Sequence, residues 1–178
     1  MTTEEIIRPI GSYNAPEEFT EIFIAAQIIE IETLPNLLSN TIEGLTDNQL
    51  NTPYRDGGWT LKQVVHHIAD SHLQAFTRFK LALTEENPTI KPYDQDAWVT
   101  TADVLEAPVQ DSVIIVKHLH SRWVTLLKSM KLEDFSRTFY HPEQKKNISL
   151  AHIIGLYAWH GKHHSLQIFN FCKSQEWK

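Results

Sequence analysis

The sequence predicts an all-α protein, a four-helix bundle whose helices are joined by long connections. Four long segments repeat apolar residues with a period near 3.6, which is typical of amphipathic helices. No segment shows a convincing alternation of apolar and polar residues, the pattern of a strand. The chain has 178 residues, of which 42% are apolar, enough for one hydrophobic core. We therefore expect a single domain over residues 1–178.

The first long helix is expected over residues 16–43, after an irregular N-terminal arm. Pro16 is followed by two glutamates, which is a typical helix start, because proline fits the first helical position and acids favour the positive end of the helix dipole. Pro35 interrupts the same segment, so a kink or a break near Leu34 is expected. Residues 46–49 carry a capping-box pattern that predicts one short helical turn.

The second helix begins after a strong start signal. Thr60 and Gln63 have the spacing of a capping box, and Pro88 marks the end of the apolar repeat that follows. The connection over residues 87–107 is long for a loop, and loops of this length are usually functional or mobile. A third helix is expected over residues 109–130.

The fourth helix follows a second irregular stretch, residues 135–147. Ser149 is a plausible N-cap, and the helical pattern continues from there to about Ser174. We thus expect four long helices and no strands. The long second connection leaves open the order in which the helices pack.

Composition and charge exclude several functional classes. The formal net charge of −6 gives no broad attraction for nucleic acid or for an anionic membrane surface. No apolar run approaches the ~18 to 20 residues that span a bilayer, and the N-terminal segment lacks the features of a signal peptide. Cys172 is the single cysteine, so no intramolecular disulfide can form. We expect a cytoplasmic protein without nucleic-acid or membrane partners.

Histidine is the residue type that points to function, because the chain has ten of them. His160 and His164 are four residues apart, a spacing with which one helix offers two imidazoles to one metal ion. The periodicity places His164 on the inward face of the helix and His163 toward water. Gly161 costs about 1 kcal/mol inside a helix and indicates the close approach of another group.

A third ligand would have to come from the second helix, which contains three histidines. On a helical wheel His72 lies within the apolar stripe, His67 lies at its edge and His66 points away. The wheel leaves His67 and His72 both open, although a residue placed like His72 is more often a buried core histidine bonded to a backbone carbonyl. Asp70 and Gln63 lie about one turn from His67, and either could accept a hydrogen bond from its ring.

Two long segments carry a resemblance to a known family. The runs TPYRDGGWTLKQVVHHIADSH and LYAWHGKHHSLQI resemble the YfiT group of the DinB-like metalloproteins, and the likeness extends over RFKLALTEENP, KPYD and FYHPE. The resemblance implies a four-helix bundle of unusual connectivity and a homodimer. It also implies one divalent ion per chain, zinc or nickel, held by three histidines. Members of this group are described as metal-dependent hydrolases, and relatives transfer the low-molecular-weight thiol bacillithiol.

The family pattern assigns the ligands residue by residue. The second histidine of the HH pair is His67, and the pair on the last helix is His160 and His164. The resemblance therefore implies these three residues as the metal ligands. Gly161 stands where the family motif commonly has a polar residue, which leaves the ligands intact.

Three neutral imidazoles leave part of the coordination sphere of the ion open to water or substrate. The ion then lowers the pKa of a coordinated water from 15.7 toward about 7, which favours hydrolysis of a small-molecule substrate. An alternative is transfer of a thiol whose proton the ion displaces. A second alternative is a non-catalytic metal-binding protein with a closed site.

The catalytic side chains are not fixed by any pattern. The candidates are Asp70, Arg55 and Tyr93. Each also has an ordinary structural explanation: Asp70 could lie on an exposed polar face, Arg55 could form a surface ion pair in a turn, and Tyr93 could be a core aromatic residue. The sequence has no G-x-S-x-G elbow and no HExxH motif, which disfavours a serine hydrolase and a zincin protease.

Overall fold

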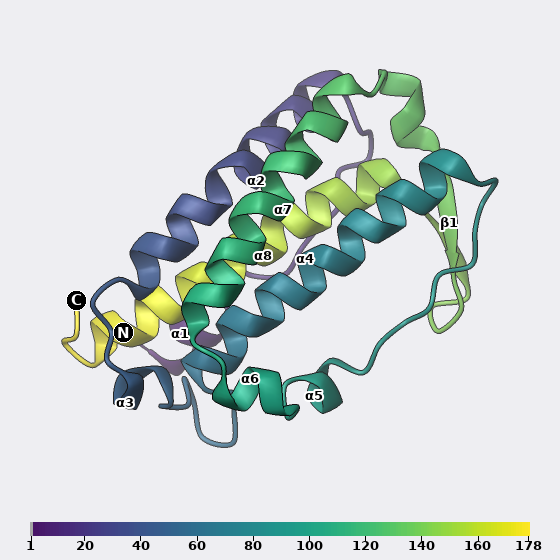
Figure 1. Cartoon of the computed structure of the whole chain (residues 1–178). Coiled ribbons are helices and arrows are strands. Elements are labelled where there is room, and N and C mark those ends of the chain that lie inside the picture. Colours follow the sequence, from purple (N-terminus) through teal and green to yellow (C-terminus); the bar gives the residue numbers. More distant parts are fainter. Residues whose placement is uncertain (1) are drawn as a thin grey trace.

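Four long helices form the bundle in the computed structural model, which describes residues 2–178 (Figure 1). They are α2 (Glu21–Ile42), α4 (Leu61–Thr84), α7 (Val109–Ser129) and α8 (Leu150–Ser174). Helix α2 packs against α7 and α8, and α4 packs against the same two helices. The order around the bundle is therefore α2, α8, α4, α7, and the consecutive long helices α2 and α4 occupy opposite corners.

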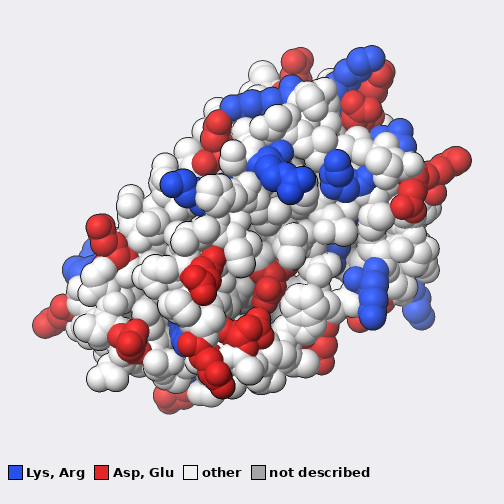
Figure 2. Space-filling view, viewed as in Figure 1, with Lys and Arg blue, Asp and Glu red and all other residues white. Residues whose placement is uncertain are grey.

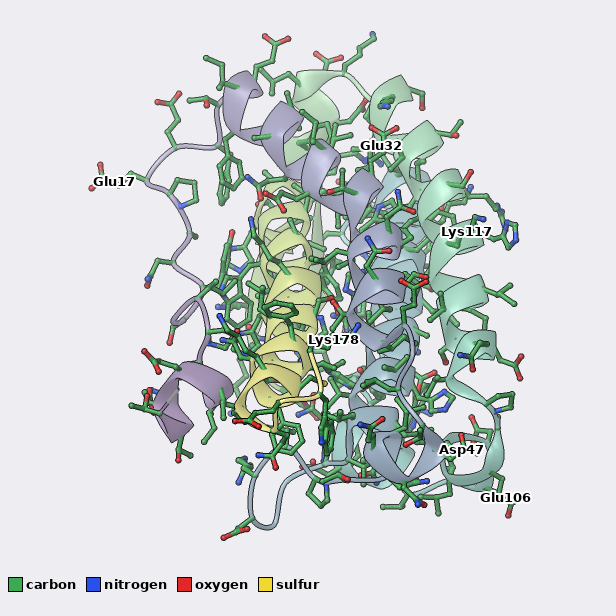
Figure 3. The ribbon with its side chains drawn as sticks, turned by 90° about the vertical axis from the view of Figure 1, so that its left-hand side faces the viewer. Glu17, Glu32, Asp47, Glu106, Lys117 and Lys178 are labelled. Carbon is green, nitrogen blue, oxygen red and sulfur yellow. The ribbon has the colours of Figure 1, made fainter. Side chains whose placement is uncertain are left out.

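Short elements fill the connections, and a further short helix, α1 (Thr3–Ile7), forms in the N-terminal arm that was expected to be irregular. The elements in the connections are α3 (Asp47–Leu50), α5 (Gln95–Trp98), α6 (Ala102–Glu106), the 3-10 helix η1 (Leu132–Ser136), β1 (Thr138–His141) and β2 (Lys146–Ser149). Helices α3, α5 and α6 gather at the end of the bundle where α4 begins (Figure 1). The same end is seen in Figure 3 with Asp47 and Glu106 labelled. The expected loop over residues 87–107 thus contains two short helices.

The predicted helix starts are confirmed where a side chain caps the helix. The amide of Gln63 donates to the Thr60 hydroxyl at 3.1 Å, and the Gln63 side chain accepts from the Thr60 amide at 2.8 Å. The box at residues 46–49 caps α3 in the same way. Ser149 caps α8 by accepting from the amide of His152 at 3.2 Å. These local bonds satisfy amides that a helix leaves unpaired at its start.

Helix α2 differs from its prediction at both of the marked prolines. It begins at Glu21, because Thr20 rather than Pro16 provides the cap and accepts from the amide of Phe23 at 3.2 Å. The helix is continuous through Pro35, so the predicted break is absent. Proline lacks the N–H that would bond four residues back, so the carbonyl of Ile31 has no donor from residue 35.

A two-stranded hairpin corrects the expectation that the chain has no strands. Strands β1 and β2 pair antiparallel, with Phe139 opposite Ile148 and both side chains buried. Each strand has four residues, which is too short for an alternating pattern to be recognised in a sequence. The expected irregular segment 135–147 is therefore ordered as η1 and this hairpin.

The hydrophobic core consists of two clusters stacked along the bundle. One contains Phe79, Trp123 and Ile154, and the other contains Leu38, Leu61 and Ile168. On each long helix the residues of one cluster precede those of the other along the chain. The buried His72 of α4 and His120 of α7, and the half-buried His160 and His164 of α8, lie along their helices between the residues of the two clusters.

Helix α2 also corrects the expectation about apolar runs. It is long enough and apolar enough to span a membrane by length and composition alone, with a mean hydropathy of 1.3 in its most apolar window. Its side chains Ile31, Leu34 and Leu38 are buried in the bundle core, and Glu30 and Glu32 lie on its outer side. Ile22 and Ile29 of the same helix are exposed, so core packing accounts for only part of its apolar character.

Charge is unevenly distributed on the face of the molecule shown in Figure 2. Acidic side chains gather over the lower part, where Figure 1 places α3, α5 and α6, whereas the upper part carries both signs. The end of the bundle at which α4 begins is therefore the more acidic end.

Candidate metal centre

Three histidines from two long helices converge at one place in the bundle. His67 comes from α4, and His160 and His164 come from α8 one turn apart. Each offers a ring nitrogen, and these three atoms lie within 4.8 Å of one another. The Nε2 atoms of His67 and His160 are 3.1 Å apart, close to the separation of about 3.3 Å between two nitrogens at about 2.0–2.1 Å from a tetrahedral zinc ion.

The donor set fits a divalent ion with room for a further ligand. Within residues 2–178, the group that contains His67, His160 and His164 includes no fourth histidine, cysteine or carboxylate. His67 is buried, whereas the two histidines of α8 are half-buried. An arrangement of three protein ligands with an open position is typical of catalytic rather than structural zinc sites.

The three histidines lie at the base of a cleft of about 370 Å³. The cleft is walled by the turn before α4 and by the start of α5. Its other lining residues are Tyr54, Arg55, Gly57, Gly58, Trp59, Gln95 and Asp96. The ring of Trp59 packs 4.8 Å from the ring of His67, centroid to centroid. A small molecule in this cleft would contact the histidine group and one side chain of each charge, Arg55 and Asp96.

Burial keeps the three imidazoles uncharged at neutral pH. It lowers the pKa of His67 to about 4. Burial and the neighbouring His67 lower the pKa of His164 to about 3, although the hydrogen bond to Gln167 opposes the shift. Burial and the surrounding histidines hold the pKa of His160 well below its usual range. The neutral form is the one that binds metal ions.

Gln167 fixes the orientation of His164. The Gln167 Nε2 group donates to the carbonyl of Ile7 at 2.8 Å, so its Oε1 atom faces His164 Nδ1, also at 2.8 Å. The amide oxygen accepts, so His164 Nδ1 carries the proton and Nε2 keeps its lone pair. Figure 3 shows α1, which ends at Ile7, beside α8. The N-terminal helix thus supports one of the three histidines.

His160 is bonded to a second buried histidine. Its Nδ1 atom lies 3.3 Å from His72 Nε2, and His72 Nδ1 lies 2.9 Å from His120 Nε2. His72 is therefore a core residue and lies outside the group of three, bonded to two rings rather than to a backbone carbonyl. Gly161 makes room for this contact, because a Cβ atom there would lie 3.1 Å from His72 Cε1 and would collide with Leu34. The close approach predicted from Gly161 is confirmed.

Two other histidines are placed differently from their predictions. His163 was expected to face water but is buried, with its ring stacked 4.6 Å from that of Trp159. The N-terminal arm covers this face of α8, with Tyr13 packed near Trp159. His66 was expected to point away but is buried against α7, where its Nδ1 atom lies 2.7 Å from the Ser112 hydroxyl. Periodicity along one helix does not reveal what covers its outer face.

Among the described residues, neither predicted hydrogen-bond partner of His67 bonds to its ring. Gln63 instead caps α4 and donates to the carbonyl of Val99 at 2.9 Å. Asp70 is half-buried, and burial together with the nearby Asp103 raises its pKa to about 6. Among the described residues, no hydrogen bond joins Asp70 to His67. Spacing along the helix placed both residues near His67 but could not fix their directions.

Of the three proposed catalytic side chains, the structure brings only Arg55 to the cleft. Arg55 is exposed there and forms no ion pair with Asp56 or with any other residue in the range 2–178. Its Nε group donates to the Tyr54 hydroxyl at 3.3 Å. Tyr93 does not line the cleft; its ring packs 4.6 Å from that of Trp98, and burial raises its pKa to about 12.

Trp59, Gln95 and Asp96 are cleft residues that were not predicted. Trp59 directly precedes the capping residue Thr60, and no pattern singles it out as a binding residue. Gln95 and Asp96 lie in the long connection, which was singled out by its length but offered no pattern to rank its residues. The Asp94 side chain caps α5 by accepting from the amides of Asp96 and Ala97 at 3.0 Å each, which sets the start of this helix.

Comparison with known proteins identifies the family. A model of the DinB superfamily matches residues 30–168, which include all three histidines of the centre. The chain belongs to the DinB superfamily. The resemblance seen in the two histidine-bearing runs is therefore confirmed over most of the chain.

Relatives of this DinB protein carry names that refer to a metal and to hydrolysis. A protein of Oceanobacillus iheyensis named "Putative metal-dependent hydrolase" is 49% identical over 169 residues, 95% of this chain and 97% of the relative. A Bacillus cereus protein of the same name is 50% identical over 169 residues, 95% of this chain and 96% of the relative.

A solved structure has the same fold. YfiT from Bacillus subtilis, described as a "probable metal-dependent hydrolase with an unusual four-helix bundle topology", superposes with a TM-score of 0.94 and is 42% identical. The match covers 98% of this chain and 99% of YfiT. The four-helix bundle of this DinB protein, with α2 and α4 at opposite corners, is therefore shared with YfiT.

Proposed function

We propose that this DinB protein is a hydrolase that holds one zinc or nickel ion on His67, His160 and His164 and acts on a small molecule bound in the adjacent cleft. The observation that carries the proposal is the group of three neutral imidazoles that line an open cleft, with no fourth histidine, cysteine or carboxylate grouped with them in the described part of the chain. When bound there, the ion would polarise a substrate carbonyl and make a water molecule more acidic at neutral pH. The names of the relatives support the same reaction class.

The side chains of the cleft supply the remaining roles. Among the described residues, Asp96 is the only carboxylate that lines the cleft, so we assign to it the role of accepting a proton from water. Within residues 2–178 Arg55 forms no ion pair, and its guanidinium could bind an anionic group of the substrate. Trp59 packs on His67, shields that ring from water and offers an apolar surface to the substrate.

Parallel activity screens of the metal-loaded protein test this proposal. One screen uses small amides and esters, and the other uses a small thiol with electrophiles. We expect turnover in the first screen, loss of turnover in H164A and in metal-stripped protein, and its return on adding the metal. Turnover in the thiol screen alone, or amide turnover that survives metal removal, would contradict the proposal.

Substitution of Asp96 tests the proton-accepting role separately. D96N is expected to lower kcat by about 10²- to 10⁴-fold, the contribution typical of a general base, with the metal content unchanged. E106Q is the matched control, because Glu106 is an acid at the same end of the molecule that lines a different groove. Equal activities of D96N and E106Q would show that Asp96 does not accept a proton in the reaction.

A further inference from the structure

The proline inside α2 leaves a buried carbonyl available for a side chain. Residue 35 cannot donate to the carbonyl of Ile31, because proline has no N–H. The ring of His120, which comes from α7, occupies the vacant position, with its Nδ1 atom 2.6 Å from the Ile31 oxygen. Both side chains are buried, with relative exposures of 0% for Ile31 and 1% for His120. A residue that is unfavourable for the helix thus creates an acceptor in the core.

From this carbonyl, hydrogen bonds run through three rings to the candidate metal centre. His120 Nε2 lies 2.9 Å from His72 Nδ1, and His72 Nε2 lies 3.3 Å from His160 Nδ1. We call His120, His72 and His160 the histidine relay. Its members come from α7, α4 and α8, and the carbonyl that accepts from its first ring belongs to α2, so these hydrogen bonds join all four long helices.

The chemistry of the first bond fixes the proton on every ring that follows. A carbonyl oxygen only accepts, so Nδ1 of His120 must be the donor. A neutral imidazole carries one proton, so Nε2 of His120 accepts and Nδ1 of His72 donates to it. The same argument makes His72 Nε2 an acceptor and His160 Nδ1 a donor. The Nε2 atom of His160, which faces the other two candidate ligands, is left with its lone pair.

We propose that His120 and His72 are positioning residues that transmit the polarity of the Ile31 carbonyl to His160 and hold its Nε2 lone pair toward the metal. The proposal rests on the proposed metal-binding function and adds two residues that bind neither metal nor substrate. Without the relay, an isolated neutral His160 could place its proton on either nitrogen, and the tautomer protonated on Nε2 cannot bind a metal at that atom.

The surroundings of the relay keep its protons in place. His72 has a relative exposure of 0%, so water is excluded from its ring. Burial lowers the pKa of His120 to about 4, so this ring carries a single proton at neutral pH. Trp123 and Tyr157 pack edge-on against the ring of His72 at 6.1 and 5.2 Å, which restricts its rotation. The absence of a side chain at Gly161 leaves the space that the ring occupies.

The direct test is the tautomeric state of each histidine in the metal-free, full-length protein. Long-range proton–nitrogen NMR spectra of a sample with ¹⁵N-labelled histidine distinguish a protonated Nδ1 from a protonated Nε2. We expect His120, His72 and His160 all to be protonated on Nδ1. A proton on Nε2 of His120 or His160, or a mixture of tautomers at either ring, would overturn the proposal.

Metal affinity of relay variants gives a second readout. In H120L the Nδ1 proton of His72 loses its acceptor, so we expect zinc affinity, measured by competition with a chelator, to fall by about 10- to 100-fold. In H120Q the amide can donate to Ile31 and accept from His72, so we expect the affinity to stay within about threefold of wild type. A merely structural role for His120 would not give this order together with the matching change in the His160 tautomer.

H66Q is the matched control, because His66 is also buried but is bonded to Ser112 outside the relay. Its zinc affinity should equal that of wild type. Wild-type affinity in folded H120L would contradict the proposal. If H120L does not fold, the tautomers of the wild-type protein decide the proposal. Failure of wild type to bind metal would contradict the proposed function, whereas the tautomers of the metal-free protein test the relay alone.

Discussion

At the scale of single residues, the candidate metal centre depends on which nitrogen of each imidazole is free. In two of the three histidines the choice is fixed by a chain of hydrogen bonds whose last acceptor is a main-chain carbonyl. His164 donates to Gln167, which is held by Ile7, and His160 is connected through the relay to Ile31. Carbonyl oxygens cannot reverse their role, so both lone pairs are directed before any ion binds.

Alanine variants of the candidate ligands should separate them from their neighbours. H160A and H164A are expected to lose stoichiometric metal, because two imidazoles alone make a weak site. H163A should keep its metal, since the ring of His163 stacks on Trp159 and is not one of the three candidate ligands. Elemental analysis of the purified variants gives the ratio of metal to chain. Full metal content in H164A would count against the ligand set.

Gln167 provides a residue-scale test away from the ligands themselves. Q167L removes the acceptor of His164 Nδ1 and should weaken zinc binding by about 10- to 100-fold, as is usual when a group that orients a ligand is lost. Chelator competition measures the change. N170A is a suitable control, because Asn170 also bonds to α1, at the carbonyl of Glu5, without contacting a candidate ligand. Equal losses in both variants would indicate that only the docking of α1 matters.

At the scale of elements, α2 explains why a proline lies in the middle of a core helix. Pro35 removes one helical hydrogen bond and thereby frees the Ile31 carbonyl for His120. In the sequence, Pro35 is unfavourable for a helix. In the structure, the carbonyl that it frees is connected to the candidate metal centre through His120 of α7 and His72 of α4.

Substitution of Pro35 should therefore affect metal binding without weakening the helix. In P35A the new N–H can bond to the Ile31 carbonyl and compete with His120, although a carbonyl accepts two hydrogen bonds, so the loss of zinc affinity should be smaller than in H120L. The free energy of unfolding should not fall through helix propensity, because proline costs about 3 kcal/mol inside a helix relative to alanine. N36A is the neighbouring control. Unchanged affinity together with an unchanged His160 tautomer in P35A would argue against the connection.

Elements with a local signal were predictable, and those that depend on distant partners were not. The capping boxes at Thr60 and at residues 46–49 involve side chains three residues apart, so the sequence alone locates these helix starts. The hairpin of β1 and β2 has strands too short to show a period. The burial of His163 depends on the N-terminal arm, which lies far from it in the chain.

At the scale of the whole molecule, the bundle brings His67, His72, His120 and His160 of three helices into one connected group of rings. Helical spacing accounts for His160 and His164 sharing a face, but the choice of His67 over His72 needed the family resemblance. The cleft could not be predicted, because Arg55, Trp59 and Asp96 meet only when the turn before α4 and the long connection fold over the same end of the bundle.

A layer of buried neutral histidines makes the stability of the metal-free protein depend on pH. His67, His120 and His164 have pKa values of about 4, 4 and 3 in the folded protein, against about 6.5 when unfolded. Between these values the unfolded chain binds more protons, so the free energy of unfolding falls as pH is lowered from about 6.5 toward 4. Asp70, with its pKa raised to about 6, has the opposite sign but is a single group.

Urea denaturation of the metal-free protein at a series of pH values measures this dependence. In H120Q the slope should decrease by one proton, about 1.4 kcal/mol per pH unit, because one buried imidazole is lost. H118Q is the control, since His118 is exposed. A free energy of unfolding that does not change between pH 6.5 and 4.5 would show that the histidine layer is charged or solvated in the folded protein.

The central claim is that three imidazoles hold one ion that keeps a position open to the cleft. Anomalous X-ray diffraction at the zinc and nickel absorption edges, from crystals of the protein as purified, locates such an ion directly. We expect one peak per chain at about 2.0–2.1 Å from the Nε2 atoms of His67, His160 and His164, with no fourth side chain bound. A peak elsewhere, or a fourth protein ligand that closes the site, would contradict the account.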